Sequence, residues 1–383
     1  MKIFYTCYND LSMQAGDARH IMEIAENLKG LGHEVLVFAP KKAHYRQKSP
    51  IKIVYVPLIN VRILNILSYN LVLFFYLFFY SFRKRPDAIY SRQMGWCLTP
   101  LLISKLMRLP LVMEIQVVES GDKGTKKEMA LGFITRLHLK LCDRVITTNK
   151  FSKQRIQAIF GIPSEKINVV PCGANIDLFR PIPIPEARKR LSLDQEGYFV
   201  GSVSTLYPWH GEEYLLKAAP FILKELPKTK FIIVGEGVNK EELIALAQKL
   251  GIYEKVIFTG EVLYEKVPQF INALDLGVSF FKPVRKDGGN PIKLYEYFSC
   301  ARPVIASDVK GYGDFVEGVG AGISVDATDP ERLAKEIIYL LKNRQLRRQM
   351  GEKGRKAVVE GYSWEKAAKK VERVCEEVLA SKR

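Results

Sequence analysis

The sequence predicts an α/β fold of two doubly wound domains, each a parallel sheet with helices on both faces, that face one another across a cleft. Three observations support this. A chain of 383 residues is longer than a domain with a single hydrophobic core usually is, so two domains are expected. Its composition, 48% apolar and 26% charged, is that of an ordinary globular protein and not of a disordered one. Short apolar runs alternate with helix-period segments along the chain, which is the rhythm of strand–helix–strand units.

In the first half, apolar runs rich in β-branched and aromatic residues are predicted to be strands, with helical sequence such as Ala18–Leu31 between them. Because parallel strands are covered on both faces, they appear as nearly continuous apolar runs. The predicted strands are residues 2–8 (KIFYTCY), 33–40 (HEVLVFAP), 51–58 (IKIVYVPL), 86–92 (PDAIYSR), 109–116 (LPLVMEIQ) and 143–149 (DRVITTN).

A second series of strands is predicted from residue 198 onward. Its members are residues 198–204 (YFVGSVS), 230–237 (KFIIVGEG), 254–262 (EKVIFTGEV), 276–283 (LGVSFFKP), 302–307 (RPVIAS) and 321–326 (AGISVD). Between the two series, residues 180–197 (RPIPIPEARKRLSLDQEG) begin with several prolines and are predicted to be an interdomain linker. We therefore place the first domain at residues 1–180 and the second at 181–361. Ser363 is placed to cap a final amphipathic helix.

Residues 63–82 (ILNILSYNLVLFFYLFFYSF) form an apolar segment long enough to span a bilayer, with basic residues at both ends. Polar residues interrupt it at Asn65, Ser68 and Asn70. Three interpretations stay open: a helix buried or partly buried in the first domain, an aromatic-rich helix that lies in a membrane surface, or a transmembrane span. Attachment to a membrane surface fits the basic first half best.

The net charge of +17 is concentrated in that first half. Residues 1–180 contain 26 Lys and Arg against 13 Asp and Glu, whereas residues 181–383 contain 32 against 28. A basic half favours an anionic partner, such as a membrane face or an acidic substrate; charge that serves only solubility is the alternative. A nucleic-acid partner is not expected, because no recognised module and no interleaving of aromatic with basic residues is present.

Six cysteines are scattered without a CxxC pair, which predicts buried or free thiols in a reducing cytoplasm. The first residues (MKIFYTCYND) are typical of a strand and lack the apolar region and cleavage site of a signal peptide. The expected location is therefore the cytoplasm. Because the first half is basic, attachment to the inner face of the cell membrane is also expected.

One stretch of the second half, FFKPVRKDGGNPIKLYEYFSCARPVIASD, gathers positive charge around a glycine-rich loop that opens a helix. Backbone N–H groups exposed by Gly288, Gly289 and Asn290, together with the helix dipole, would bind a phosphate or diphosphate. Pro291 suits a first helical turn, and Glu296 could accept hydrogen bonds from ribose hydroxyls. The surrounding cations are Lys282, Arg285, Lys286 and Lys293. A strand–turn–helix without a ligand is the alternative.

Three further strand ends carry small residues. Residues 200–211 (VGSVSTLYPWHG) end a strand and then present Trp209 and His210, and residues 232–237 (IIVGEG) end another in a Gly-x-Gly turn. Gly16, in the first half, serves either a phosphate or a tight turn. The third glycine of a dinucleotide site is missing and no GxxxxGK[ST] loop exists, which disfavours NAD and excludes a P-loop NTPase. No His/Cys cluster has metal-ligand spacing, so no catalytic metal is expected.

Taken together, several separated motifs resemble one family, the retaining nucleotide-sugar-dependent glycosyltransferases of family 4, also called group 1. The motifs are QAGDARHIMEIAENLKGLGHEVLVFAP, DRVITTNKFSKQRI, EKINVVPCGANIDLFRP, GEEYLLKAAPFILKELPKTKFIIVGEG, VIFTGEV, LYEYFSCARPVIASDVKGYGDFV and SWEKAA. The resemblance spans nearly the whole chain. It implies the two-domain GT-B fold, in which a terminal helix (here residues 362–383) packs back on the first domain.

The resemblance also implies a reaction: transfer of a sugar from a nucleotide diphosphate sugar to a saccharide or lipid-linked acceptor, with retained anomeric configuration and with no metal or cofactor. Negative charge on the leaving diphosphate would be stabilised by a helix dipole, backbone N–H groups and cations. In the usual proposal for the family, the departing phosphate oxygen accepts the proton of the acceptor.

The donor loop departs from the family pattern. Glu296 matches the second of two family glutamates, which binds the ribose, but Gly288 stands at the first position and Asp287 lies one place earlier. Asp287 could contact the sugar hydroxyls. On the earlier phosphate loop, Ser202 and His210 replace an Arg and a Lys.

Other side chains are expected to compensate. Lys293 and Arg285 would supply the missing cations, and His210 would donate to the diphosphate or pack structurally. Gln116 stands where many family members have a histidine that faces the sugar, and its amide could bind the sugar or the acceptor but not transfer a proton.

The candidate residues fall into three groups. Those expected in catalysis are His210, Lys293, Glu296 and Asp287. Those expected to bind the donor are Gly16, Ser204, Gly235, Gly237, Val262, Arg285, Gly288, Gly289, Asn290, Pro291 and Ile292. Those expected on the acceptor side are Gln116, Arg92 and Asp17.

Two alternatives to a transferase are a nucleotide-sugar epimerase of related architecture and a non-catalytic protein that binds a nucleotide sugar. The first would convert the donor without an acceptor. The second would bind nucleotide without turnover, as the altered phosphate loop allows. The sequence does not select the nucleotide base, the sugar or the acceptor.

Overall fold

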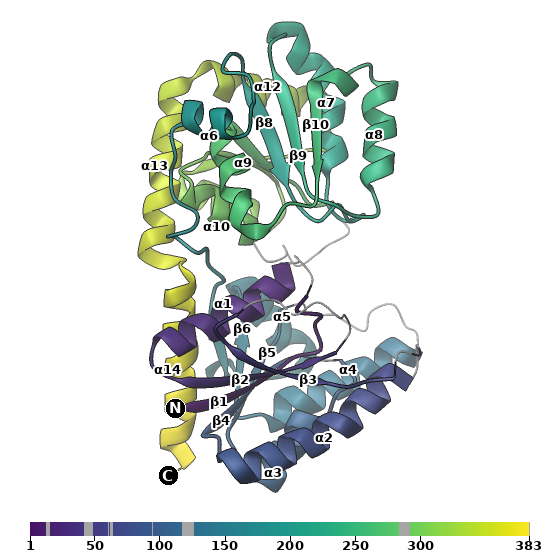
Figure 1. The fold of residues 1–383 in the computed structure, drawn as a ribbon, viewed down its shortest axis with the longest axis vertical. Coiled ribbons are helices and arrows are strands. Elements are labelled where there is room, and N and C mark those ends of the chain that lie inside the picture. The colour runs from purple at the N-terminus through teal and green to yellow at the C-terminus, as the bar shows by residue number, and fades with distance from the viewer. Residues whose placement is uncertain are drawn as a thin grey trace. The chain divides into compact units, whose positions relative to one another are not determined.

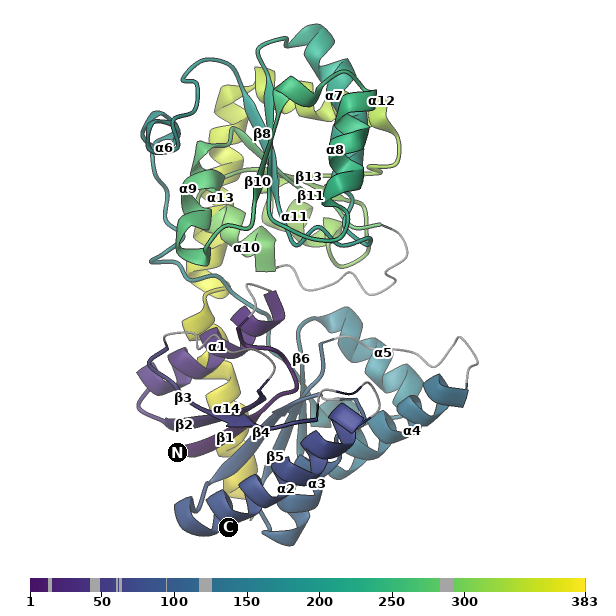
Figure 2. The same cartoon turned by 45° about the vertical axis from the view of Figure 1, so that its right-hand side comes forward.

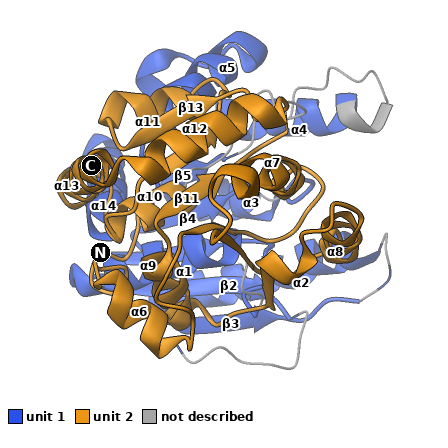
Figure 3. Cartoon of the chain, turned by 90° about the horizontal axis from the view of Figure 1, so that it is seen from above, with its two compact units in different colours: residues 1–172, 364–383 blue, residues 173–363 orange. Residues whose placement is uncertain are grey.

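A computed structural model describes residues 1–12, 16–41, 49–59, 61, 64–93, 95–116, 126–282 and 292–382. The chain divides into two compact units (Figure 3). Unit 1 consists of Met1–Cys172 and Trp364–Arg383, and unit 2 of Gly173–Ser363. Each unit is built around one parallel sheet (Figure 1).

The sheet of unit 1 has seven parallel strands in the order β3-β2-β1-β4-β5-β6-β7. The strands are β1 (Lys2–Thr6), β2 (Glu34–Pro40), β3 (Lys52–Val56), β4 (Ala88–Arg92), β5 (Leu111–Glu114), β6 (Arg144–Thr147) and β7 (Ile167–Val169). The first six coincide with predicted strands. We did not predict β7, because its three residues are too few to show a periodic pattern.

The helices of unit 1 cover both faces of this sheet (Figures 1 and 2). On one face, α2 (Leu64–Lys84), α3 (Thr99–Leu106), α4 (Lys126–Leu141) and α5 (Lys150–Phe160) share a single hydrophobic core with the strands. On the other face, α1 (Gly16–Gly30) packs against α14 (Trp364–Lys382). A short 3₁₀ turn, η1 (Ser164–Lys166), precedes β7.

The last helix, α14, returns to unit 1, as the family resemblance implies. It begins directly after Ser363, and the Trp364 ring packs edge-on against the His20 ring of α1 at a centroid distance of 5.2 Å. Near its middle, Glu372 lies 2.6 Å from the Nε2 atom of His33. α14 is therefore part of unit 1, although 191 residues of unit 2 separate it from the rest of that unit in the sequence.

The long apolar segment forms α2, which is buried on one face only. Tyr69, Leu73, Leu77 and Ser81 are its buried residues, and they recur every four positions. The opposite face is exposed and also apolar. Among the described residues, α2 is the one helix long and apolar enough to cross a membrane, as judged by length and composition alone.

The sheet of unit 2 has six parallel strands in the order β10-β9-β8-β11-β12-β13. They are β8 (Phe199–Val203), β9 (Lys230–Val234), β10 (Val256–Gly260), β11 (Leu276–Ser279), β12 (Val304–Ser307) and β13 (Gly322–Val325), and all six coincide with predicted strands. On one face, α7 (Glu212–Glu225), α8 (Lys240–Lys249) and α12 (Pro330–Lys342) share a core with the strands.

The remaining helices of unit 2 lie on the other side of its sheet (Figure 1). They are α6 (Ile184–Arg190), α9 (Val267–Ala273), α10 (Ile292–Ser299), α11 (Gly313–Val319) and α13 (Arg344–Gly361). Of the two 3₁₀ turns, η2 (Tyr253–Lys255) contacts α8 and η3 (Tyr264–Lys266) contacts α9. Close packing of α13 against α10 depends on Gly354, where an added Cβ would lie 3.1 Å from the Phe298 side chain.

The proline-rich segment predicted as an interdomain linker is instead part of unit 2. It contains α6, which packs against α9, and the N–H of Ile182 donates to Asn272 Oδ1 at 2.9 Å. The buried Arg188 guanidinium lies 2.6 Å from Asp275. The prolines therefore start a helix and do not mark a free linker, since proline is favoured in a first helical turn. By packing, the compact units divide after Cys172, eight residues before the predicted boundary at residue 180, and again after Ser363.

The two faces of α2 are expected to differ in their effect on stability. Leu73 is fully buried and Leu71 is exposed, although they lie on the same helix and have the same side chain. Leu73→Ala should destabilise the protein by about 2–5 kcal/mol, because it leaves a cavity in the core. Leu71→Ala should change the free energy of unfolding by less than about 0.5 kcal/mol. Urea unfolding followed by circular dichroism compares the two, and equal losses would contradict the one-sided burial of α2.

Candidate functional site

The sheet of unit 2 changes direction between β8 and β11. From β8 the chain proceeds outward through β9 and β10, whereas from β11 it proceeds the other way through β12 and β13. At such a switch point the connections after the two strands go to opposite faces of the sheet, and ligands of doubly wound folds bind there. The connection after β8 leads to α7 and the one after β11 leads to α10. Of the predicted catalytic residues that the structure describes, His210 lies on the first connection, and Lys293 and Glu296 lie on α10.

The structure brings His210 and Lys293 together at this switch point. His210 precedes α7, Lys293 is the second residue of α10, and the Lys293 ammonium lies 3.1 Å from His210 Nδ1. A β-bridge pairs His210 with Phe281, and the two rings lie 5.2 Å apart. The ammonium also lies 5.6 Å from the centre of the Phe281 ring, within cation–π range.

This contact favours one tautomer of a neutral His210. A charged lysine ammonium has only donors, so next to it Nδ1 would accept and the ring proton would lie on Nε2. The imidazole thus presents an Nε2–H donor, the kind of group that could bind a phosphate oxygen. His210 is 6% exposed, so burial limits the orientations that its ring can adopt.

A buried carboxylate, Glu212, lies behind this pair. Its Oε1 atom accepts hydrogen bonds from the hydroxyls of Ser204 at 2.5 Å and Ser202 at 3.2 Å. Burial raises the pKa of Glu212, and the charge of Lys293 and the bond from Ser204 offset part of that rise. The hydroxyl of the predicted donor residue Ser204 is therefore directed to a protein carboxylate in this structure.

Glu296 lies on α10 and is buried. The next residue, Tyr297, ties the helix to the end of β8, because its hydroxyl accepts a hydrogen bond from the N–H of Val203 at 2.8 Å. Ile292, also predicted in the donor site, is the first residue of α10 and is partly buried. The remaining predicted residues of this loop lie outside the described residues: Arg285, Asp287, Gly288, Gly289, Asn290 and Pro291.

Gly235 and Gly237, predicted to bind the donor, allow backbone segments to approach closely. Gly235 has a φ of 134°, and an added Cβ would lie 1.8 Å from the carbonyl oxygen of Ser204. At Gly237 it would lie 2.6 Å from the carbonyl oxygen of Leu206. The turn after β9 thus packs against the connection after β8, which makes glycine a structural requirement here. Val262, two residues beyond β10, is partly buried.

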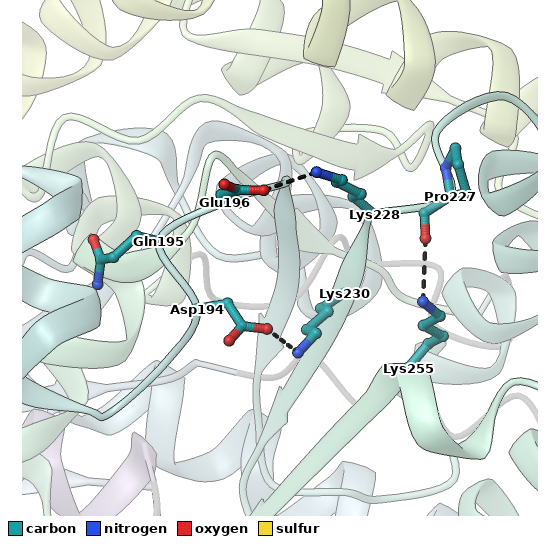
Figure 4. A pocket seen from close by; sticks show the side chains of 7 residues that line it. All are labelled: Asp194, Gln195, Glu196, Pro227, Lys228, Lys230 and Lys255. Atoms are coloured by element: carbon teal, nitrogen blue, oxygen red, sulfur yellow. Dashed lines mark hydrogen bonds and ion pairs between the residues drawn. The ribbon is translucent and has the colours of Figure 1, made fainter.

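A surface pocket of about 360 Å³ in unit 2 lies elsewhere (Figure 4). Its walls include Lys230 at the start of β9 and Lys255 just before β10, so it adjoins the amino ends of the strands. Its lysines already have partners, as the dashed lines in Figure 4 show: Lys228 lies 2.7 Å from Glu196, and Lys230 pairs with Asp194. This pocket is distinct from the candidate site.

Unit 1 has an equivalent switch point between β1 and β4, since β2 and β3 extend to one side and β5, β6 and β7 to the other. The predicted acceptor-side residues meet here. Arg92, the last residue of β4, donates to the carbonyl oxygen of Asp17 at 2.8 Å and to Gln116 Oε1 at 2.6 Å. Gly16 and Asp17 are exposed and begin α1.

A buried ion pair between His20 and Glu114 lies next to Gln116 and holds it in place. Glu114, the last residue of β5, accepts a hydrogen bond from Gln116 Nε2 at 2.6 Å and lies 2.7 Å from His20 Nε2 of α1. The Tyr90 hydroxyl donates to the other carboxylate oxygen at 2.5 Å, and His20 Nδ1 lies 3.1 Å from Cys172 Sγ.

Both charges of this pair are retained despite complete burial. Burial opposes a charge on His20, but the neighbouring Glu114 and Cys172 outweigh it and raise the pKa of His20 to about 9. Burial likewise opposes a charge on Glu114, but His20, Arg92 and the Tyr90 hydroxyl outweigh it and lower the pKa of Glu114 to about 2. The pair locks α1 to β5 beneath Arg92 and Gln116.

Within the described parts of both units, no three His, Cys, Asp or Glu side chains gather in a group that could hold a metal ion. All six cysteines are buried, and none of them forms a disulfide. Burial raises the pKa of four of the thiols, Cys97, Cys142, Cys300 and Cys375, to about 12, so they stay protonated and unreactive.

Comparison with known protein families gives two matches that divide the chain between them. The profile described as Glycosyltransferase Family 4 matches residues 15–178, and the profile described as Glycosyl transferases group 1 matches residues 183–357. A curated relative from Mycobacterium tuberculosis, a GDP-mannose-dependent alpha-(1-6)-phosphatidylinositol monomannoside mannosyltransferase, is 30% identical over 292 residues. The match covers 74% of this chain and 67% of that relative. The chain belongs to the family 4 glycosyltransferases.

Solved structures assign the fold of this glycosyltransferase. Sucrose-phosphate synthase from Thermosynechococcus elongatus superposes with a TM-score of 0.82 at 18% identity, covering 99% of both chains. Anabaena HepE, solved in complex with UDP-glucose, superposes with a TM-score of 0.78 at 19% identity, covering 100% of both chains. The fold is therefore GT-B, as the sequence resemblance implied.

Several residues of the glycosyltransferase that shape these sites were not predicted. Glu212 and Glu114 are both buried acids, and His20 is a buried base. Glu114 carried a signal, since an acid within the apolar strand LVMEI must be paired if it is buried. Glu212 carried none, because an acid in the first turn of a helix is normally a solvent-exposed partner of the helix dipole.

The pH dependence of unfolding should report the His20–Glu114 pair. The pKa of His20 is raised above 6.5, so its contribution is complete below pH 6.5 and is lost as the pH rises through about 9. We expect the wild type to lose about 3 kcal/mol over this window relative to His20→Gln.

His138 provides the matched control. Burial lowers the pKa of His138 to about 4, so it stays neutral above pH 6.5, and His138→Gln should not alter the alkaline slope. NMR titration of the imidazole resonances gives the same information directly. A His20 midpoint at or below 6.5 would refute the buried ion pair.

Proposed function

We propose that this glycosyltransferase transfers a sugar from a nucleoside diphosphate sugar to a saccharide or lipid-linked acceptor, with retention of configuration and without a divalent metal. The observation that carries the proposal is the His210–Lys293 pair at the switch point of unit 2, 3.1 Å apart and joined to the start of α10. It offers an ammonium and an imidazole N–H, two donors suited to a diphosphate.

The names of similar proteins support a nucleotide-sugar donor. The mycobacterial relative is named for GDP-mannose, and the HepE structure was solved with UDP-glucose. These two differ in base and sugar, so we propose only the shared chemistry, a nucleoside diphosphate sugar. Glu296, on the same helix as Lys293, would accept hydrogen bonds from the ribose, as the family resemblance implies.

In the proposed reaction, the bond between the anomeric carbon and the diphosphate oxygen breaks, and both electrons remain on the diphosphate. Lys293, the Nε2–H of His210 and the backbone N–H groups at the start of α10 would stabilise that charge. The leaving oxygen would accept the proton of the acceptor hydroxyl, and the acceptor would bond to the same face of the sugar. No cofactor takes part in this scheme.

Unit 1 would bind the acceptor, and its chemistry fits a binding role. Gln116 is an amide that cannot transfer a proton, Arg92 stays charged, and both are held in place by hydrogen bonds. The name of the mycobacterial relative includes a phosphatidylinositol acceptor, which supports a lipid-linked class. We propose a cytoplasmic location, at the inner face of the cell membrane where such an acceptor is found.

Side chains of unit 2 should control the rate of transfer. We expect Lys293→Met, His210→Ala and Glu296→Ala each to lower kcat/KM by about a hundredfold to a thousandfold, as loss of a preorganised donor or binding group does. Transfer would be measured with radiolabelled nucleotide sugars. Lys230→Met, in the charged pocket at the other end of the sheet, is the control and should keep the wild-type rate. Wild-type turnover by the Lys293 and His210 variants would refute the assignment.

Nucleotide binding should not need a metal. A nucleoside diphosphate that binds the folded protein raises its melting temperature, and about 2.7 kcal/mol of stabilisation is expected at a hundredfold excess over Kd. A panel of UDP, GDP, ADP and their sugars, each with and without EDTA, would identify the base. An identical shift in EDTA is the expected result. A shift that appears only with added magnesium would overturn the metal-independent mechanism.

A further inference from the structure

We propose that the outward face of α2, together with neighbouring parts of α3 and α4, is a docking surface for an anionic lipid bilayer. This inference adds a binding surface to the membrane location given under the proposed function. It depends on the proposed function only for the choice of the inner membrane face. α2 would lie along the membrane surface and would not cross the bilayer.

The first observation is a continuous apolar stripe on α2. Its members recur every three or four residues and so share one side of the helix. Their exposed fractions range from 46% to 73%. The members, hereafter the α2 stripe, are Leu64, Leu67, Leu71, Phe75, Phe79 and Phe82. Such a stripe is expected to be buried by something, because monomeric soluble proteins seldom expose a contiguous apolar patch of this kind.

The other side of α2 is anchored in unit 1. The Tyr69 hydroxyl donates to the carbonyl oxygen of Cys7 at 2.6 Å, and the Thr99 hydroxyl donates to the carbonyl oxygen of Asn70 at 3.0 Å. Leu73 and Leu77 are fully buried in the core beneath the sheet. A transmembrane orientation would have to break these contacts, whereas an orientation parallel to the surface keeps them.

Adjacent helices extend the apolar surface. α3 packs against α2 and exposes Leu102 and Leu106. α4, on the same face of the sheet, exposes Met129 and Phe133. In the described part of unit 2, by contrast, no helix exposes more than one large apolar residue, as in Phe221 on α7 and Val359 on α13. The clustering is thus particular to this face of unit 1.

The charged residues around the α2 stripe favour an anionic bilayer as its binding partner. Residues 64–109 contain six Lys and Arg but one acid, Asp87, whose carboxylate accepts the N–H of Lys2 at 2.6 Å. The exposed cations at the ends of α2 and α3 are Arg83, Lys84, Arg85, Lys105 and Arg108. A second copy of this chain would bring like charges together across a two-fold interface. An anionic bilayer takes up the apolar stripe and attracts the cations at about 1 kcal/mol for each one near the surface.

Vesicle flotation tests the proposal with the full chain. Wild-type protein should float with vesicles of phosphatidylglycerol and phosphatidylcholine, bind phosphatidylcholine alone weakly, and lose affinity at high salt. F75S/F79S should bind the anionic vesicles at least about tenfold more weakly, because two aromatic side chains no longer enter the interface. The matched control, F221S/Y339S, removes two exposed aromatic side chains from unit 2 and should bind as wild type does.

A second variant separates the apolar contribution to lipid binding from the electrostatic one. R83Q/K84Q/R85Q should lose the preference for anionic lipid while its weak binding to phosphatidylcholine is unchanged. Equal binding by wild type and F75S/F79S would overturn the proposal. So would wild-type protein that resists extraction by alkaline carbonate, as a spanning helix does, or a dimer that F75S/F79S dissociates in sedimentation.

The same variants distinguish failure of this inference from failure of the proposed function. Transfer to a soluble acceptor, or donor hydrolysis in detergent-free solution, should proceed at the wild-type rate in F75S/F79S, since the stripe lies outside the donor and acceptor residues. Lost lipid binding with retained transfer supports the docking surface. Absent transfer in the wild type would contradict the proposed function while leaving the lipid result intact.

Discussion

The direction change within each parallel sheet is the constraint on which the candidate sites depend. In a parallel sheet all strand ends of one kind lie on the same edge, and at a reversal the connecting segments go to opposite faces. The connections after β8 and β11 in unit 2 therefore bring His210 and Lys293 within 3.1 Å, although 83 residues separate them in the sequence. In unit 1 the same geometry brings Arg92 to Asp17.

Both switch points place a buried carboxylate behind a basic side chain. In unit 2 this is Glu212 behind Lys293, and in unit 1 it is Glu114 behind Arg92. Glu114 is paired with His20 and accepts a hydrogen bond from the Tyr90 hydroxyl, whereas Glu212 accepts hydrogen bonds from Ser204 and Ser202 and its pKa stays raised by burial. Other groups position the cations: the Asp17 carbonyl oxygen and Gln116 hold Arg92, and His210 contacts Lys293.

Burial on one face only lets α2 stabilise unit 1 and, as we propose, also bind a membrane surface. The inner face supplies core residues such as Leu73 to unit 1, and that packing fixes the helix against the sheet. The outer face is then held at the surface as an apolar stripe that the protein itself does not cover. α2 combines high hydropathy with partial burial, and in our proposal this connects the fold of unit 1 to the membrane where a lipid-linked acceptor would be met.

The sequence by itself determined every described strand except β7, the order of those strands, the two-unit α/β organisation and the family, because these depend on local periodicity and on contiguous motifs. It misjudged residues 180–197 as a linker, since packing of α6 on α9 is a tertiary contact that proline content does not reveal. It could not show that Ser204 bonds Glu212, that His20 pairs with Glu114 across 94 residues, or which side of α2 is buried. Only the tertiary structure shows these contacts and the buried face of α2. Each depends on which side chains the sheet topology brings together, and the separation of two residues in the sequence does not predict whether they meet.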